Sequence, residues 1–463
     1  TGPIDNETIR AGLHISDASD NTIGPGNVIS GVDYGIYITE GMDTPGVITA
    51  NNKIIGNLIG TNADGTGAVP NRHGVHIENI KGVQVGGYLE EERNVISGNH
   101  IGVNILGAEA EYSVVVGNYI GTNKDGSGRI PNYNGVRITD GKYNLIGGPD
   151  EGSRNVISGN SHNGVWIIGS GTADSLGNAV QGNYIGLAAN GLDPLGNEAM
   201  GVAIRLAAGN LIGGPEDAHR NIVSANGVLN TNNFGIYIEE GQPEIGNTIQ
   251  GNYVGTDVSG MIEVGNLSAG IVITNASQNK ILDNLISGNR GGIGFWEAED
   301  PGEHFTRNNI VSRNRIGLKA NGTEWLGNSY SGISVMRGND NLIGGLTPGD
   351  GNIVVGSGTS GITLSLDASG NRVLRNYVGT NPEGTIAISN NTGIAIESGA
   401  SNNTVGGNTI AFNELVGVHI DPDANENKVE GNRIRENGGE GIYLAGQDNV
   451  IGGTNDAYRN MIN

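Results

Sequence analysis

The sequence predicts an all-β solenoid, in which short strands stack coil upon coil. Two repeats lead to this prediction. A segment that resembles NVISGN recurs along the chain, and its first asparagine is Asn27, Asn94, Asn155, Asn221, Asn284, Asn352, Asn408 or Asn460. Between these segments, an element made of Gly, an aliphatic residue, any residue and then an aliphatic residue or Phe occurs once per coil. Self-similarity at such a period is the signature of a repeat architecture.

The second repeat, the G-V-x-I element, predicts the strands. In Val75-His76-Ile77 and Val136-Arg137-Ile138 the apolar residues stand two apart, which is the alternation of a half-buried strand. One such strand cannot bury its apolar face alone, but coils stacked at about 4.8 Å share a core between parallel sheets. The element begins at Gly12, Gly35, Gly74, Gly102, Gly135, Gly164, Gly201, Gly235, Gly270, Gly292, Gly332, Gly361, Gly393, Gly417 and Gly441. We therefore expect about fifteen coils and three short sheets in one continuous domain over residues 1–463.

Asparagine and glycine mark the corners between strands. The chain has 82 Gly and 13 Pro without a strict G-X-Y period, which excludes collagen. An asparagine at the same corner of every coil suits a left-handed backbone conformation, and its amide can bond to the next amide along the axis. We expect ladders of asparagine side chains.

Composition excludes several partners and sites. Lys and Arg total 25 against 48 Asp and Glu, a net charge of −23, which disfavours binding to nucleic acid. The absence of cysteine excludes disulfides and thiolate sites, and no apolar run reaches the roughly 20 residues of a membrane helix. This composition favours a location outside the cell or on its surface, without membrane insertion.

The repeat N-x-I-x-GN followed by G-V-x-I resembles that of the right-handed parallel β-helix proteins of bacteria and archaea, the pectate-lyase-like and NosD-like repeats. The resemblance covers nearly the whole chain and implies a right-handed β-helix. It implies no single function, since such proteins include polysaccharide lyases, epimerases, glycoside hydrolases, tailspikes and surface proteins.

The resemblance also implies that a substrate would lie along the outward face of the G-V-x-I strands. Rings flanked by carboxylates and an arginine suit a sugar polymer, because pyranose faces stack on aromatic rings and hydroxyls bond to charged groups. Stacking between coils also explains such rings without any ligand. The candidate polysaccharide-binding residues on this face are His76, Glu78, Trp166, Arg205, Tyr237, Glu239 and Trp296.

A pair of carboxylates stands out near the C-terminus. The elements at Gly393 and Gly417 are 24 residues apart, so Glu397 is expected beside Asp421 on the next coil. A cation would relieve their repulsion, and Glu397, Asp421, Asp423 and Asn425 offer oxygen ligands for Ca²⁺. The same pair would suit a retaining glycoside hydrolase, and two solvated carboxylates need neither role.

The repeat is least regular between residues 290 and 315, and we expect a loop insertion at about 290–330. Insertions in solenoids lie on one face and often carry specificity. Its candidate catalytic residues are Glu299, Glu303, His304 and Arg307, with Glu or His as the base and Arg as the charge stabiliser. A loop packed by its own aromatic residues would need no chemistry.

The chain stops within an NVIS-like unit, at Arg459 to Asn463, and shows no terminal cap. Either the chain is part of a longer repeat protein, or its open coil pairs end to end with another copy. Together these observations favour an extracellular structural or adhesive solenoid that contacts polysaccharide. The alternative is a carbohydrate-active enzyme, a lyase, hydrolase or epimerase, that uses the G-V-x-I face and the 290–315 segment.

Overall fold

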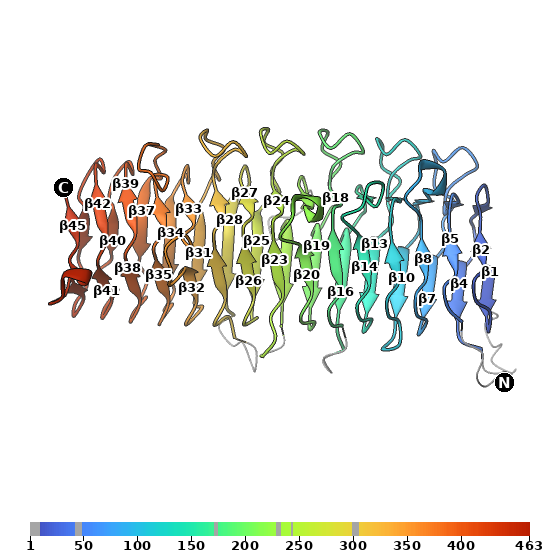
Figure 1. The fold of residues 1–463 in the computed structure, drawn as a ribbon, viewed down its shortest axis with the longest axis horizontal. Helices are drawn as coiled ribbons and strands as arrows, with labels where there is room; N and C mark the ends of the chain where they lie inside the picture. Colours follow the sequence, from blue (N-terminus) through green and yellow to red (C-terminus); the bar gives the residue numbers. More distant parts are fainter. Residues whose placement is uncertain (1–9, 42–48, 171–174, 228–232, 242–243, 299–304) are drawn as a thin grey trace, which may run out of the picture. The chain divides into compact units, whose positions relative to one another are not determined.

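The computed structural model describes residues 10–41, 49–170, 175–227, 233–241, 244–298 and 305–463. The chain divides into two compact units, Thr1–Val202 and Ala203–Asn463. In both units each coil supplies one strand to each of three parallel sheets, which we call A, B and C (Figure 1). Across the two units the strands form fifteen sets of three, as the fifteen G-V-x-I elements predict.

Sheet A contains the G-V-x-I elements, paired in parallel register within each unit. In the first unit its strands are β1 (Ala11–Ser16), β4 (Tyr34–Thr39), β7 (His73–Glu78), β10 (Ile101–Leu106), β13 (Asn134–Thr139) and β16 (Val165–Ile168). The boundary between the units falls within β19 (Val202–Arg205). In the second unit its strands are β22 (Ile236–Glu239), β25 (Ala269–Thr274), β28 (Gly291–Trp296), β31 (Ile333–Met336), β34 (Ser360–Ser365), β37 (Thr392–Ile396), β40 (Val418–Ile420) and β43 (Ile442–Leu444).

Sheet B is made of strands of two or three residues. In the first unit they are β2 (Thr22–Ile23), β5 (Lys53–Ile54), β8 (Gln84–Val85), β11 (Val114–Val115), β14 (Leu145–Gly147) and β17 (Ala179–Gln181). In the second unit they are β20 (Leu211–Gly213), β23 (Thr248–Gln250), β26 (Lys280–Leu282), β29 (Ile310–Ser312), β32 (Leu342–Gly344), β35 (Arg372–Leu374), β38 (Thr404–Gly406), β41 (Lys428–Glu430) and β44 (Val450–Ile451).

Sheet C holds the NVIS and NYIG segments. In the first unit its strands are β3 (Val28–Ile29), β6 (Leu58–Ile59), β9 (Val95–Ile96), β12 (Tyr119–Ile120), β15 (Val156–Ile157) and β18 (Tyr184–Ile185). In the second unit they are β21 (Ile222–Val223), β24 (Tyr253–Val254), β27 (Leu285–Ile286), β30 (Arg315–Ile316), β33 (Ile353–Val354), β36 (Tyr377–Val378), β39 (Thr409–Ala411), β42 (Arg433–Arg435) and β45 (Met461–Ile462).

The helices in the described residues are three short 3₁₀ turns, η1 (Glu90–Glu92), η2 (Asp217–His219) and η3 (Asp456–Tyr458). None of them has the length and apolarity that crossing a membrane requires.

The core lies between the three sheets of each unit. Val75 and Ile77 of β7 are fully buried, as are Val136 and Ile138 of β13. The predicted alternation is confirmed at these positions, because the inward residues of successive coils stack into one apolar core.

Asparagine ladders run along the coils, as predicted. In the first unit the amide Nδ2 of Asn57 donates to Oδ1 of Asn94 at 3.1 Å, and Asn94 donates to Asn118 in the same way at 2.9 Å. The backbone prediction for these asparagines is wrong. The left-handed residue is the preceding glycine in the GN pairs, for example Gly56 with φ of 63° and Gly117 with φ of 69°. Glycine accepts that conformation without strain, and the asparagine then turns its amide inward.

The segment 290–315 is more regular than its sequence suggests. Residues Gly291–Trp296 form β28, which pairs in register with β25 and β31, and β29 and β30 continue sheets B and C. The departure from the repeat is therefore confined to the connection between Trp296 and Ile310, of which residues 299–304 lie outside the described part of the chain.

Candidate functional site

The outward face of sheet A in the first unit carries a polar groove of about 300 Å³, which we call the N-terminal groove. It lies over β4, β7, β10 and β13. Its lining residues are Tyr34, Arg72, His73, His76, Glu78, His100, Ile101, Asn104, Leu106, Arg137 and Thr139.

The strand register places these side chains in columns. His76 of β7 is opposite Tyr37 on one side and Asn104 on the other, and Asn104 is opposite Arg137. His73 is opposite Tyr34 in a second column. Neighbouring members of a column are about 4.8 Å apart, so functional groups from consecutive coils meet without any loop.

His73 and His76 both lie on the outward face. Strict alternation would place two residues that are three apart on opposite faces of the strand. A Cβ on Gly74 would lie 2.9 Å from the side chain of Ile96 and 2.6 Å from the carbonyl oxygen of Gly102, so Gly74 packs against the neighbouring coil. The simple alternation of a strand is broken there, and both histidines face the groove. Their Nδ1 atoms are 2.8 Å apart.

The contacts of His76 favour one tautomer. Asn104 donates from Nδ2 to Nδ1 of His76 at 2.8 Å, so this nitrogen is an acceptor. The proton of the ring is then on Nε2, which lies 3.5 Å from the Glu78 carboxylate. Nδ1 of His76 also lies 2.8 Å from Nδ1 of His73, and only one proton can lie between these two nitrogens. In the tautomer in which His73 carries that proton, Nε2 of His73 keeps a free lone pair.

The surroundings keep both rings neutral. Burial lowers the pKa of His73 to about 3, and the nearby charges of His76 and Arg72 act in the same direction. Burial also lowers the pKa of His76, although Glu78 opposes it. Burial and a 2.6 Å hydrogen bond donated to Glu78 raise the pKa of Tyr37 to about 12. At neutral pH both imidazoles are therefore uncharged, and the Tyr37 phenol in the neighbouring coil keeps its proton.

Arg137 supplies positive charge beside these rings. Its guanidinium stacks over Trp166 at 5.1 Å, donates from Nε to the hydroxyl of Thr139 at 3.1 Å, and forms no ion pair with any carboxylate of the described residues. Burial lowers its pKa. A half-buried arginine without a counter-ion, in a protein with a charge of −23, is suited to bind an anionic ligand.

Aromatic rings continue the groove along the coils. His100 stacks on Tyr133 at 5.0 Å, and Tyr133 stacks on His162 at 4.7 Å. Tyr34 stacks on Tyr37 at 4.9 Å. Such flat surfaces match the faces of sugar rings.

The predicted binding residues fall into separate groups. His76 and Glu78 line the N-terminal groove, and Trp166 supports Arg137. Arg205, Tyr237 and Glu239 belong to the second unit, where Arg205 donates to Glu240 at 2.8 Å and lies 3.6 Å from Glu239. These two carboxylates already neutralise Arg205, so it is a weaker candidate for an anionic ligand than Arg137.

The predicted calcium ligands gain no support from the geometry. Asp421 pairs with Nε2 of His419 at 2.8 Å, and Oδ1 of Asn425 accepts the amide of Gln447 at 2.6 Å. Burial raises the pKa of Glu397, and the negative charge of Asp421 raises it further. These two carboxylates therefore interact across adjacent coils. Within the described ranges, no group of three or more His, Asp or Glu side chains is placed to hold a metal ion.

Three of the four predicted catalytic residues are not part of the described structure, so this set stays a prediction. Glu299, Glu303 and His304 lie outside the described residues. The guanidinium of Arg307 stacks over Phe305 at 5.0 Å. The groups that meet in the N-terminal groove are instead His73, Tyr34, Arg72 and His100, which stand just before the G-V-x-I elements and were not among the predicted residues.

Two family models match the chain. The "Right handed beta helix region" matches residues 322–463, and the "Periplasmic copper-binding protein (NosD)" family matches residues 208–345. Both matches agree with the parallel β-helix that the three sheets form. The handedness implied by the repeat is thereby confirmed, and the two matches together span residues 208–463.

Several solved structures match most of the chain at low sequence identity. The periplasmic alginate epimerase AlgG is 14% identical over 84% of this chain and 77% of its own, with a TM-score of 0.35. The A-module of the Azotobacter vinelandii mannuronan C-5 epimerase AlgE6 is 15% identical over 96% and 89%, with a TM-score of 0.32. A mutant tailspike protein of E. coli bacteriophage HK620, in complex with a pentasaccharide, is 13% identical over 88% and 60%, with a TM-score of 0.41. No curated protein matches this β-helix chain at a significant level.

Proposed function

We propose that this β-helix protein is a carbohydrate-active enzyme that removes the C5 proton of a uronic acid unit in a polysaccharide, as a lyase or an epimerase. The observation that carries the proposal is the meeting, in one groove, of a neutral His73–His76 pair with the half-buried, unpaired Arg137. The interpretation that the sequence favours, a structural or adhesive solenoid that contacts polysaccharide, gives no reason for that combination.

The chemistry requires three groups. The proton on a carbon next to a carboxylate is weakly acidic, so the carboxylate must be neutralised before a base can remove it. Arg137 and Arg72 line the groove and supply that positive charge. His73 supplies a base that is unprotonated at neutral pH because its pKa is about 3. A base with so low a pKa is weak, and its effectiveness depends on its position and on stabilisation of the enolate.

The steps balance without a further reagent. The C5–H bond breaks, the proton passes to Nε2 of His73, and the electron pair moves into the carboxylate as an enolate paired with the Arg137 guanidinium. In an epimerase, the Tyr34 hydroxyl then gives its proton to C5 from the opposite face, and exchange with solvent afterwards returns a proton to Tyr34 and removes one from His73. In a lyase, the electron pair forms the C4–C5 double bond and expels the glycosidic oxygen at C4, which takes a proton from the Tyr34 hydroxyl.

Glycoside hydrolysis fits this groove less well. That reaction uses two carboxyl groups on opposite sides of the bond, and of the residues that line the N-terminal groove in the described structure only Glu78 carries a carboxyl. Glu78 is also occupied by the hydroxyl of Tyr37 and by the ring of His76.

The proposed location is outside the cytoplasm, in the periplasm or at the cell surface. The cysteine-free composition suits it, and the NosD family that matches residues 208–345 is described as periplasmic. The proposed partner is an anionic polysaccharide.

A screen tests the reaction. The protein is incubated with polymers of mannuronate, guluronate, galacturonate and glucuronate and with neutral glucans, while ultraviolet absorbance follows unsaturated ends. A separate NMR analysis follows a change of configuration at C5. We expect one uronate polymer to react, neutral glucans to be inert and the His73→Gln variant to be inactive. Absence of change in every uronate polymer would contradict the proposal.

A further inference from the structure

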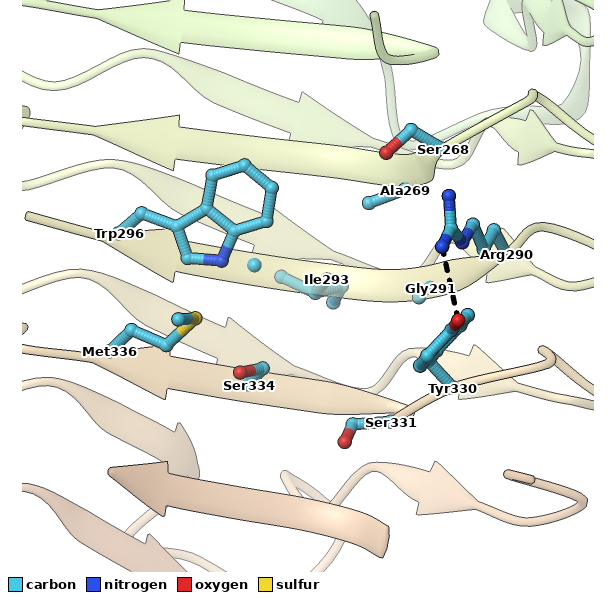
Figure 2. Close-up of a pocket in the computed structure, with 12 residues that line it drawn as sticks. Ser268, Ala269, Arg290, Gly291, Ile293, Trp296, Tyr330, Ser331, Ser334 and Met336 are labelled. Atoms are coloured by element: carbon cyan, nitrogen blue, oxygen red, sulfur yellow. Dashed lines mark hydrogen bonds between the residues drawn. The ribbon is translucent and has the colours of Figure 1, made fainter. Parts of the chain in front are cut away.

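A second pocket, of about 250 Å³, opens on the outward face of sheet A within the second unit (Figure 2). We call it the Trp296 pocket. Its lining residues are Ser268, Ala269, Arg290, Gly291, Gly292, Ile293, Gly294, Trp296, Tyr330, Ser331, Ser334 and Met336. All of them belong to the second unit, so this pocket is separate from the N-terminal groove.

The pocket exists because two outward positions of β28 have no side chain. Gly291 and Gly294 occupy the places in their strand that His73 and His76 occupy in β7, the residue before the G-V-x-I element and its third residue. Neither glycine has a positive φ, so the backbone does not require glycine there. A Cβ on Gly291 would meet the Ala269 side chain at an ordinary 3.6 Å. These glycines therefore keep a hollow open, with backbone as its floor.

Trp296 forms one wall of the pocket. Its ring packs edge-to-face against Phe234, with the two ring centroids 5.2 Å apart. A Cβ on Gly294 would lie 2.9 Å from Nε1 of Trp296, so the indole lies against this bare position. Nε1 is buried and has no hydrogen-bond partner in the described structure. Figure 2 shows this nitrogen edge turned toward the middle of the pocket, where a ligand oxygen could accept its hydrogen bond.

Arg290 and Tyr330 form the opposite wall (Figure 2). The Arg290 guanidinium lies 4.8 Å from the centre of the Tyr330 ring, and Nη2 donates to the tyrosine hydroxyl at 3.0 Å. No carboxylate of the described residues pairs with Arg290. The hydroxyls of Ser268, Ser331 and Ser334 lie around the floor.

We infer that the Trp296 pocket binds a single sugar ring that carries an anionic group. The ring would fit against the indole and the glycine floor, its anionic group would pair with Arg290, and its hydroxyls would bond to the serines. An uncharged ring would leave Arg290 without a counter-ion. This site goes beyond the proposed activity and does not depend on it, because it is a binding site in the other unit and contains no base.

Fluorescence of Trp296 reports binding directly. In a chain whose other two tryptophans are replaced, by Trp166→Phe and Trp325→Phe, the emission is titrated with trisaccharides of galacturonate, mannuronate or guluronate and with the neutral trisaccharide maltotriose. We expect saturable quenching or shift with at least one uronate trisaccharide, and at least about tenfold weaker binding of maltotriose. Equal affinity for charged and neutral trisaccharides, or no saturable change with any of them, would overturn the inference.

Variants locate the ligand. Arg290→Ala is expected to weaken uronate binding about tenfold, with partial recovery in Arg290→Lys. Ser334→Leu adds an apolar side chain to the pocket lining and should abolish binding. The matched control is Arg372→Ala, which removes an exposed arginine from sheet B and should leave the affinity unchanged. Unchanged affinity in both Arg290→Ala and Ser334→Leu would place the ligand elsewhere.

If the tryptophan replacements or Ser334→Leu impair folding, isothermal titration calorimetry can measure uronate binding to the unchanged chain and to Arg290→Ala. Arg290 is exposed, so its replacement leaves the core intact. Failure of this inference and failure of the proposed reaction are distinguishable. His73→Gln should keep uronate binding at Trp296 while it loses turnover, and Arg290→Ala should keep turnover of polymer while it loses binding at Trp296.

Discussion

Nδ1 of His73 lies 2.8 Å from Nδ1 of His76 on the outward face of β7. Two imidazolium rings at this distance would repel strongly, and one proton between the two nitrogens satisfies both. The contact therefore requires that the pair stay largely neutral, and it explains why the charge of His76 contributes to the lowered pKa of His73.

The pH dependence of stability follows from that shift. The pKa of His73 is about 3 in the folded chain and about 6.5 when unfolded, so its contribution is fully present above pH 6.5 and is lost as the pH falls from 6.5 toward 3. Both chains should lose unfolding free energy between pH 6.5 and 4. We expect this loss to be smaller in His73→Gln than in the unchanged chain, by about 1–3 kcal/mol. Thermal melts of both chains across this range measure it. Parallel pH curves for the two chains would contradict the shift.

Tyr37 is predicted to position Glu78 and His76. Tyr37→Phe removes the 2.6 Å hydrogen bond to the Glu78 carboxylate, which then interacts with His76 alone. The pKa of His76 should rise, and the acid limb of the kcat/KM profile on a uronate polymer should move to higher pH. A purely structural role would lower activity at every pH without moving the profile. Tyr112→Phe, on an exposed tyrosine outside the groove, is the control.

Arg137 is predicted to hold the carboxylate of the substrate and the enolate that forms from it. Arg137→Ala should lower kcat/KM on a uronate polymer by about 10²–10³, and Arg137→Lys should restore part of the loss because the charge returns without the planar fork. Steady-state kinetics separates the effects on kcat and KM. Arg129→Lys is the matched control, since Arg129 belongs to an ion pair with Glu198 at 2.5 Å. A similar loss in this control would indicate a general effect of replacing arginine.

The asparagine ladders are predicted to be a major source of stability. Nδ2 of Asn284 donates to the carbonyl of Ile249 at 2.9 Å and to Oδ1 of Asn314 at 3.0 Å. Asn284→Ala leaves buried partners unsatisfied and should cost about 2–4 kcal/mol of unfolding free energy, since each orphaned buried group costs about 1–3 kcal/mol. Asn321→Ala, in an exposed turn, should change it by less than about 0.5 kcal/mol. Chemical unfolding measures both, and equal effects would contradict the role of the ladder.

The fold could be predicted from sequence because its causes are local and repeated. The pair Val75 and Ile77 specifies an inward face, and the same spacing returns in every coil, so stacking follows without knowledge of distant contacts. What the repeat does not specify is backbone detail. The left-handed corner belongs to Gly56 and not to Asn57, because asparagine is already committed to the ladder.

The site could be predicted only in part. His76 and Glu78 stand at outward positions that simple alternation identifies. His73 was missed because Gly74 packs against the next coil and breaks that alternation, so a residue three before His76 also faces outward. The signal that could have found it is the aromatic or histidine residue directly before the glycine in Tyr34-Gly35 and His73-Gly74. The importance of Arg137 depends on its lack of a counter-ion, which only three-dimensional contacts reveal.

The most direct test of the central claim is an NMR spectrum of uronate polymer after incubation with the protein in D₂O. The account predicts that at least one polymer shows either deuterium at C5 of inverted units, the mark of an epimerase, or vinyl H4 signals of unsaturated ends, the mark of a lyase. Both should vanish in His73→Gln and persist in the control variant His219→Gln, which replaces a histidine of η2. Uronate polymers with every C5 proton retained and no unsaturated ends would contradict the account.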